Sequence, residues 1–291
     1  MSTIIGGVAT SHVPAIGAAL ARGRQEEPYF RPFFEGAAQA RDWVRLAKPD
    51  AVVVLYNDHG LNFFLDKMPT FAIGAAESYR NEDEGWGLPV TAPFRGDPRL
   101  SWHIIEQLVE GEFDITSCQS MAVDHAFAIP MKLLWPEGDA PPAVPIAINT
   151  VQHPLPSVAR CFRLGQALGA AIRSFPGQGR VLVLATGGLS HQLDGARAGF
   201  INKAFDLQFL DELVAAPASL IRHSIMDLVR EAGTQGVEAL MWVAMRAALG
   251  DHVREVHRAY HIPISNTAAC TLVVEPVLAE IAEARRVGAA R

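Results

Sequence analysis

The stretch RVLVLATGGLSH, from Arg180 to His191, shows most clearly how the chain is organised. Its first part, residues 180–186, is a continuous aliphatic run, which is typical of a strand covered on both faces in a parallel sheet. Gly187 and Gly188 follow this run, and His191 comes three residues after the second glycine. The stretch therefore predicts a buried strand with a histidine in the loop at its carboxyl end.

The rest of the chain alternates strands and helices in the same style. Buried strands are expected at residues 4–10, 51–56 and 144–149, and two late strands at residues 253–259 and 271–275. Helical patterns lie at residues 33–47, 97–110, 157–174 and 236–249. Strands that alternate with helices form a mainly parallel sheet with helices on both faces. The predicted fold class is α/β, a three-layer α/β/α sandwich around a mixed, mainly parallel sheet, whose strand order the sequence leaves open.

The composition narrows the class of protein. The 291 residues are 49% apolar and 19% charged, which suits one large α/β domain or two small ones. Lys and Arg number 25 against 31 Asp and Glu, and this net charge of -6 disfavours nucleic acid or a membrane surface as a partner. No apolar run is long enough for a membrane span, and three widely separated cysteines favour a reducing cytoplasm.

Three histidines follow predicted strands at short distances. His12 comes two residues after the first strand, His59 three residues after the second, and His191 five residues after the strand at 180–186. Ligands of open α/β sheets bind outside the carboxyl ends of the strands, so three imidazoles there could share one crevice. The alternative is that each histidine bonds the backbone of its own loop, which is the commoner case for a single one. For the three together, the two interpretations are equally supported.

Two neutral imidazoles and one carboxylate form the ligand triad of non-haem iron(II) oxygenases, although zinc hydrolases use the same ligand types. Glu238, near the start of the helix at 236–249, is the candidate carboxylate. A carboxylate at that position also stabilises a helix N-terminus, and the spacing alone favours this second interpretation. His125, with Asp124 beside it, is a candidate for a further polar group at the same site.

At these residues the chain resembles the class III extradiol ring-cleaving dioxygenases, and within them the catalytic β-subunit type. The resemblance covers about residues 4–275 and implies a single catalytic domain over residues 1–291. The stretches that carry it are TSHVPAIG at 10–17, NDH at 57–59, DEGWG at 83–87, VDH at 123–125, TGGLSHQL at 186–193 and YHIPISNTA at 260–268. Each piece is short, and the combination is specific.

The resemblance implies a role for each candidate residue. His12, His59 and Glu238 are expected to hold Fe(II), His191 to be the active-site base, and His125 to be a second catalytic polar group near the substrate. The expected reaction is cleavage of a carboxylated catechol by O2. Protocatechuate opened at its 4,5 bond, to give 4-carboxy-2-hydroxymuconate semialdehyde, is the expected case, and gallate or another catechol is the alternative.

The substrate carboxylate is expected to meet Ser265, Asn266 and Thr267, which offer hydroxyl, amide and backbone donors. Without the resemblance, the same residues suit a turn that bonds its own backbone. Related gallate dioxygenases carry an extra helical segment, and its absence from this chain implies a small helical α subunit in an α2β2-type hetero-oligomer. Two other classes stay open, a metal-dependent hydrolase and a non-enzymatic binding protein on the same scaffold.

Overall fold

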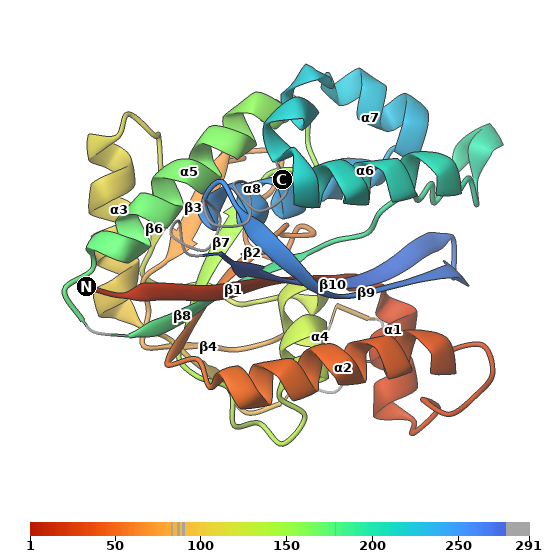
Figure 1. The fold of residues 1–291 in the computed structure, drawn as a ribbon, viewed down its shortest axis with the longest axis horizontal. Coiled ribbons are helices and arrows are strands. Elements are labelled where there is room, and N and C mark those ends of the chain that lie inside the picture. Colours follow the sequence, from red (N-terminus) through yellow and green to blue (C-terminus); the bar gives the residue numbers. More distant parts are fainter. Residues whose placement is uncertain (83, 86–87, 89–90, 178, 278–291) are drawn as a thin grey trace, which may run out of the picture.

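The computed structural model describes residues 1–82, 84–85, 88, 91–177 and 179–277. Within them, one mixed sheet lies between two layers of helices (Figure 1). Its strands follow the order β6-β3-β7-β2-β8-β1-β10-β9. The predicted three-layer α/β/α sandwich is therefore confirmed, while the single catalytic domain over residues 1–291 stays a prediction.

The strands of the large sheet are β1 (Thr3–Thr10), β2 (Ala51–Tyr56), β3 (Phe71–Gly74), β6 (Thr116–Cys118), β7 (Ala143–Ile148), β8 (Arg180–Thr186), β9 (Val253–Ile264) and β10 (Thr267–Pro276). A separate two-stranded ribbon consists of β4 (Ser78–Tyr79) and β5 (Phe94–Arg95). The helices are α1 (Pro14–Ala21), α2 (Arg31–Ala47), α3 (Pro98–Glu110), α4 (His125–Leu134), α5 (Val158–Ser174), α6 (Lys203–Ala215), α7 (Ile225–Ala232) and α8 (Ala239–Ala248). Short 3-10 turns are η1 (Gly195–Arg197), η2 (Pro217–Arg222) and η3 (Gly236–Glu238).

The centre of the sheet is parallel. Strand β8 pairs in parallel with β1 on one side and with β2 on the other. Strand β10 pairs antiparallel with β1 and with the edge strand β9. Because β2, β8 and β1 are adjacent and point the same way, their carboxyl ends open at one edge of the sheet. The loops that follow these three strands therefore start side by side.

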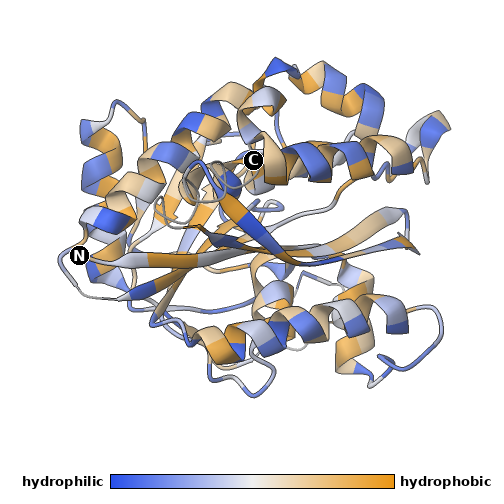
Figure 2. Ribbon diagram, viewed as in Figure 1, coloured by the Kyte–Doolittle hydropathy of each residue, from blue (hydrophilic) through white to orange (hydrophobic). Residues whose placement is uncertain are grey.

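Both faces of the central strands are covered, as the continuous aliphatic runs predict. In β2, Val53 and Leu55 belong to the apolar cluster shared with helices α3, α5 and α8, whereas Val52 and Val54 belong to the cluster shared with α2 and α4. Helix α8 is buried along its whole length, whereas α6 and α7, at the surface, carry both blue and orange segments in Figure 2. Among the described residues, no helix combines the length and the apolar character that a membrane span requires.

Two of the predicted helices, α3 and α5, begin at capping side chains. Asp97 accepts a hydrogen bond from the backbone N–H of Leu100 and starts α3, and Ser157 does the same for α5 with Arg160. Helix α4 is missing from the sequence prediction because it is short and contains Pro130, but Asp124 caps it twice, at the N–H groups of Ala126 and Phe127.

The two late strands are longer than predicted. Strand β9 continues through Pro263 to Ile264, and β10 already starts at Thr267. Proline removes a backbone donor and is tolerated at the edge of a sheet, where that donor has no ladder partner. Strand β9 is such an edge. The result is a long hairpin with Ser265-Asn266 as its turn. This turn lies between the two predicted strands, at 253–259 and 271–275.

We expect the central strands to carry much of the stability. Leu182 in β8 is fully buried, while Leu46 in α2 is 79% exposed. Replacement of Leu182 by Ala leaves a cavity and should lower the free energy of unfolding by about 2–5 kcal/mol. The matched Leu46→Ala change should stay within about 0.5 kcal/mol. Urea unfolding followed by circular dichroism measures both, and equal losses would contradict this picture of the core.

Candidate active site

The structure brings together the three strand-end histidines and Glu238. The Nε2 atom of His12 lies 3.4 Å from Glu238 Oε2, and that of His59 lies 3.5 Å from Glu238 Oε1. His191 Nε2 lies 3.7 Å from Glu238 Oε2. The buried carboxylate therefore stands among imidazoles that come from the ends of β1, β2 and β8.

Glu238 does not act as a helix cap, although the spacing alone favours that interpretation. It is the residue before α8, and its side chain makes no capping hydrogen bond. Its Oε2 accepts a hydrogen bond from the backbone N–H of Gly188 at 3.0 Å, and its Oε1 accepts one from Asn57 Nδ2 at 3.1 Å. The carboxylate is thus held in the crevice by the loops that follow β8 and β2.

The two glycines after β8 allow these groups to approach closely. Gly187 has φ of +127°, and a Cβ atom there would lie 3.0 Å from the Cβ of Glu238. A Cβ atom on Gly188 would lie 2.8 Å from His191 Nδ1. Any larger residue would push Glu238 or His191 out of place, so the turn that ends β8 needs glycine for steric reasons.

Each histidine uses its Nδ1 atom for orientation. His59 Nδ1 donates to the carboxylate of Asp124 at 2.9 Å, and His191 Nδ1 donates to the carbonyl of Leu189 at 3.2 Å. His12 Nδ1 lies 3.1 Å from the hydroxyl of Thr186, the last residue of β8. With Nδ1 occupied in this way, the Nε2 atoms face Glu238. Such outer partners fix the ring orientation and tautomer of metal-binding histidines.

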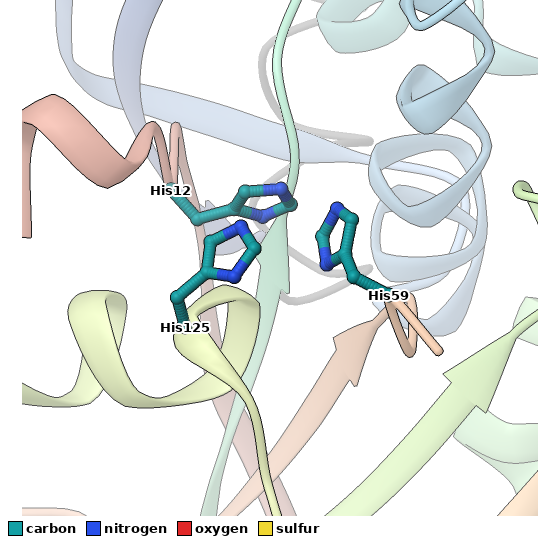
Figure 3. A group of neighbouring side chains, drawn as sticks. All are labelled: His12, His59 and His125. Carbon is teal, nitrogen blue, oxygen red and sulfur yellow. The ribbon is translucent and has the colours of Figure 1, made fainter. Parts of the chain in front are cut away.

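His125 adds a fourth imidazole from the first residue of α4. Its ring stacks on that of His59 with centroids 4.3 Å apart, and it meets His12 edge-on at 5.5 Å. Figure 3 shows the three rings turned toward one another. One ring nitrogen from each of His12, His59 and His125 lies within 4.8 Å of the other two. The geometry therefore also allows a metal site made of these three imidazoles.

The acidic partners of these histidines differ from the sequence interpretation. Asp124 neighbours His125 in the chain, but its carboxylate bonds both the ring and the backbone N–H of His59. His125 is instead held by Glu84, which accepts from its Nδ1 at 2.9 Å and from its backbone N–H at 2.6 Å. The sequence analysis quoted Glu84 only within the DEGWG motif, of which residues 83, 86 and 87 lie outside the described part of the chain.

The electrostatics of the crevice are dominated by carboxylates and imidazoles. Burial opposes the charge of His59, but the carboxylates of Asp124 and Glu238 outweigh this and raise the pKa of His59 to about 10. Burial also opposes the charge of Glu238, yet the imidazoles around it hold the pKa of its carboxyl well below the usual range. Without a bound metal, both shifts favour the ionised carboxylate of Glu238 and the protonated imidazole of His59 over their neutral forms.

A metal cation fits this arrangement. Glu238 is 5% exposed, and within the described residues it pairs with imidazoles and with no lysine or arginine. A buried carboxylate without a permanent cation is costly. Asn57 Oδ1, at the same place, is buried without a hydrogen-bond partner. Two Nε2 atoms and one carboxylate, each oriented by neighbours, make a donor set suited to a divalent transition metal.

The residues predicted to meet the substrate carboxylate lie at the turn of the β9–β10 hairpin. Ser265 has φ of +54°, and its backbone N–H donates to the hydroxyl of Tyr29 at 2.7 Å. Thr267 is buried and forms an isolated antiparallel bridge with His191. The hairpin turn therefore lies next to the loop that carries His191, with Ser265 exposed and Thr267 inside.

A cavity of about 510 Å³ lies on the other side of His125. Glu84, Asp124 and His125 contribute polar groups to its wall, while His12, His59 and Glu238 are not part of it. Its apolar wall includes Leu20, Leu88, Phe94, Ile129 and Trp135. His125 thus belongs both to the wall of this cavity and to the group of imidazoles around Glu238.

The fold and the crevice define an α/β/α sandwich with a candidate two-histidine, one-carboxylate metal centre at the carboxyl edge of its sheet. Residues 6–270 match the family described as the catalytic LigB subunit of aromatic ring-opening dioxygenase. Since this match spans most of the chain, the protein belongs to that family. The recognition of a class III extradiol dioxygenase from the sequence is thereby confirmed.

Two characterised relatives illustrate the range of the family. The chain is 38% identical over 195 residues to gallate dioxygenase of Pseudomonas putida, a match that covers 66% of this chain and 57% of that protein. It is 33% identical over 185 residues to a 2,3-dihydroxyphenylpropionate/2,3-dihydroxicinnamic acid 1,2-dioxygenase of Photorhabdus laumondii, covering 63% of this chain and 55% of that protein. The chain thus spans little more than half the length of these relatives.

A solved structure confirms the fold independently. The uncharacterized protein JW3007 from Escherichia coli K12 superimposes with a TM-score of 0.57 and 14% sequence identity. The match covers 92% of this chain and 99% of that protein. At this identity the likeness concerns the architecture alone.

The geometry predicts which carboxylate binds metal. Glu238→Gln keeps the size of the side chain but removes its charge, and it should abolish stoichiometric Fe(II) binding in anaerobic titrations. Glu84→Gln, a change of the same kind at the carboxylate that holds His125, should leave Fe(II) affinity close to wild type, because His125 is not among the expected ligands. The reverse order would place the metal on the His125 side of the cluster.

Proposed function

We propose that the chain is the catalytic subunit of an Fe(II)-dependent extradiol dioxygenase that opens the ring of a carboxylated catechol. The observation that carries the proposal is the position of Glu238, with Nε2 of His12 and His59 at 3.4 and 3.5 Å and Nε2 of His191 at 3.7 Å. Membership of the ring-opening dioxygenase family supports the reaction class.

In this proposal His12, His59 and Glu238 hold the metal. Two imidazoles and one carboxylate leave open positions on Fe(II) for a substrate and dioxygen. When bound, Fe(II) would supply the Lewis-acid and redox chemistry that couples a catechol to O2. Asn57 and the N–H of Gly188 would keep the carboxylate of Glu238 in place during turnover.

His191 would move the protons. Its Nδ1–H is directed to the carbonyl of Leu189, so in the neutral ring Nε2 carries the lone pair and faces the crevice. Nε2 can take a proton from a catechol hydroxyl and later return it to a substrate oxygen, as a general base and then a general acid. His125, held by Glu84 and in ring contact with His12 and His59, would be the second catalytic polar group.

The proposed substrate is protocatechuate, opened at its 4,5 bond to 4-carboxy-2-hydroxymuconate semialdehyde. Gallate is the alternative suggested by the name of the Pseudomonas putida relative, and the dihydroxyphenylpropionate enzymes act, by name, on another carboxylic acid. A catechol that carries a carboxylate is the chemistry common to these names. The hairpin turn Ser265-Asn266, with Thr267, would receive that carboxylate, because it adjoins the His191 loop.

We also propose that the chain works with a small helical α subunit in an α2β2-type assembly. The support is its likeness to the β-subunit type of the family, and an obligate interface of this kind buries about 2,000 Å² or more. The proposal of an α subunit would be contradicted if the purified chain alone had full specific activity and if host proteins that co-purify with it did not increase that activity.

Oxygen consumption tests the function directly. The protein is loaded anaerobically with Fe(II) and mixed with protocatechuate, gallate or catechol, while O2 uptake and the absorbance of a yellow ring-opened product are followed. One O2 per substrate is the expected stoichiometry. Binding of substrate without O2 uptake would indicate a binding protein, and turnover with Zn²⁺ in the absence of O2 would indicate a hydrolase.

His191 is expected to act in proton transfer and not in metal binding. His191→Asn should keep Fe(II) and substrate affinity but lower kcat by about 10²- to 10⁴-fold, the usual contribution of a general acid or base. His252→Asn, at an exposed histidine, is the matched control and should be neutral. A His191→Asn protein without bound iron would make His191 a ligand instead.

The substrate carboxylate is expected to bind Ser265. Loss of one hydrogen bond to a charged group costs about 1.5–3 kcal/mol, so Ser265→Ala should raise KM for protocatechuate by roughly ten- to a hundredfold. Catechol should be little affected, and its disadvantage relative to protocatechuate should shrink. Ser265→Gly removes the same hydroxyl and relieves the positive φ, so it controls for strain. An unchanged ratio in both variants would move the contact to Thr267, a backbone donor or the partner.

A further inference from the structure

Asp206 is a buried carboxylate outside the metal cluster. It lies in the first turn of α6 and is 1% exposed. Its Oδ1 accepts hydrogen bonds from the backbone N–H of Ser190 at 3.0 Å and from the Ser190 hydroxyl at 2.7 Å. Its Oδ2 accepts one from the hydroxyl of Tyr260 at 2.7 Å. Two neighbouring elements, the loop after β8 and strand β9, therefore converge on one side chain.

These contacts act on the residue that precedes His191. The loop begins with Gly187 and Gly188, which have no side chain to fix their conformation and so add flexibility. Beyond them the backbone of residues 189–191 bonds to two neighbouring segments: Leu189 and Ser190 exchange hydrogen bonds with Ala268, at 3.4 and 2.9 Å, and His191 N donates to Ala232 O at 2.8 Å while its carbonyl accepts from Gln235 N at 3.3 Å. Asp206 adds a side-chain contact to this loop, because its Oδ1 accepts from both the backbone N–H and the hydroxyl of Ser190.

The direction of His191 depends on this loop. Its ring donates from Nδ1 to the Leu189 carbonyl, a contact within the same loop, while Nε2 lies 3.7 Å from Glu238 Oε2. A rotation at Ser190 would therefore swing the ring and carry Nε2 away from Glu238. The hydroxyl of Tyr260 donates to the second oxygen of Asp206, which restrains the rotation of the carboxylate.

We propose that Asp206 is a positioning residue. Through its contacts with Ser190, it keeps Nε2 of His191 facing the crevice. The inference rests on the proposed function, in which His191 moves protons. A displacement of about 1 Å at a reacting group can cost roughly a hundredfold in rate. Asp206→Ala should accordingly lower kcat by about 10- to 100-fold, with KM and Fe(II) content close to wild type.

A double-mutant cycle separates positioning from general damage. In a protein that already carries His191→Asn, Asp206→Ala should cause no further loss of kcat, because its only route to the reaction has been removed. A variant that merely loosened the fold would lower activity in both backgrounds. The matched control is Asp211→Ala, on the same helix, whose exposed carboxylate pairs with Arg258 and should leave kcat unchanged in both backgrounds.

Two further variants keep the test decisive if Asp206→Ala fails to fold. Asp206→Asn can still accept from Ser190 while its amide donates to the Tyr260 oxygen, so it should recover most of the lost rate. Ser190→Ala removes one of the two Ser190 contacts and should lower kcat by a smaller factor, again only when His191 is present. Wild-type kcat in Asp206→Ala or Ser190→Ala, or additive losses in the cycle, would overturn the inference.

The outcomes for the two proposals are distinguishable. Absence of O2 uptake in the wild type, or full turnover by His191→Asn, would refute the proposed function. Loss of turnover in His191→Asn together with unchanged turnover in Asp206→Ala would leave the function standing and refute the positioning role alone.

Discussion

The contact on which the rest of this structure depends is the meeting of one buried carboxylate with three imidazoles. Glu238 lies within 3.7 Å of Nε2 atoms from His12, His59 and His191, and no lysine or arginine among the described residues shares it. Burial of such a charge is costly unless a cation balances it. In the proposed function a bound divalent metal would provide that balance, and the surrounding amide, hydroxyl and carboxylate partners would orient its ligands.

The sheet makes this meeting possible. Strands β2, β8 and β1 are adjacent and parallel, so loops from three distant parts of the sequence begin at one edge. Gly187 then lets the β8 loop approach Glu238, and Gly188 lets it approach the His191 ring, more closely than a residue with a side chain would allow. The site is therefore a consequence of strand order, and its precision comes from short-range contacts such as Asp124 with His59 and Asp206 with Ser190.

Much of this could be predicted from the sequence, because local patterns carry it. The strands at 51–56 and 180–186 have the predicted bounds, since continuous aliphatic runs with sharp ends leave little choice. Pro130 within α4 argues against a helix there, and Pro263 within β9 argues against so long a strand, so the sequence predicts neither. Partners far apart in sequence could not be found: Glu84 lies 41 residues from His125, and Asp124 lies 65 from His59. Such pairs depend on how the loops pack, for which one sequence has no local signal.

The central claim is that the metal binds between His12, His59 and Glu238. Anomalous diffraction at the iron edge, from crystals loaded with Fe(II) under anaerobic conditions, tests it most directly. The account predicts one iron peak within bonding distance of His12 Nε2, His59 Nε2 and a carboxylate oxygen of Glu238, with His191 unbound. A peak on His125, or in the group formed by His59, Glu84, Asp124 and His125, would contradict it, as would the absence of any peak.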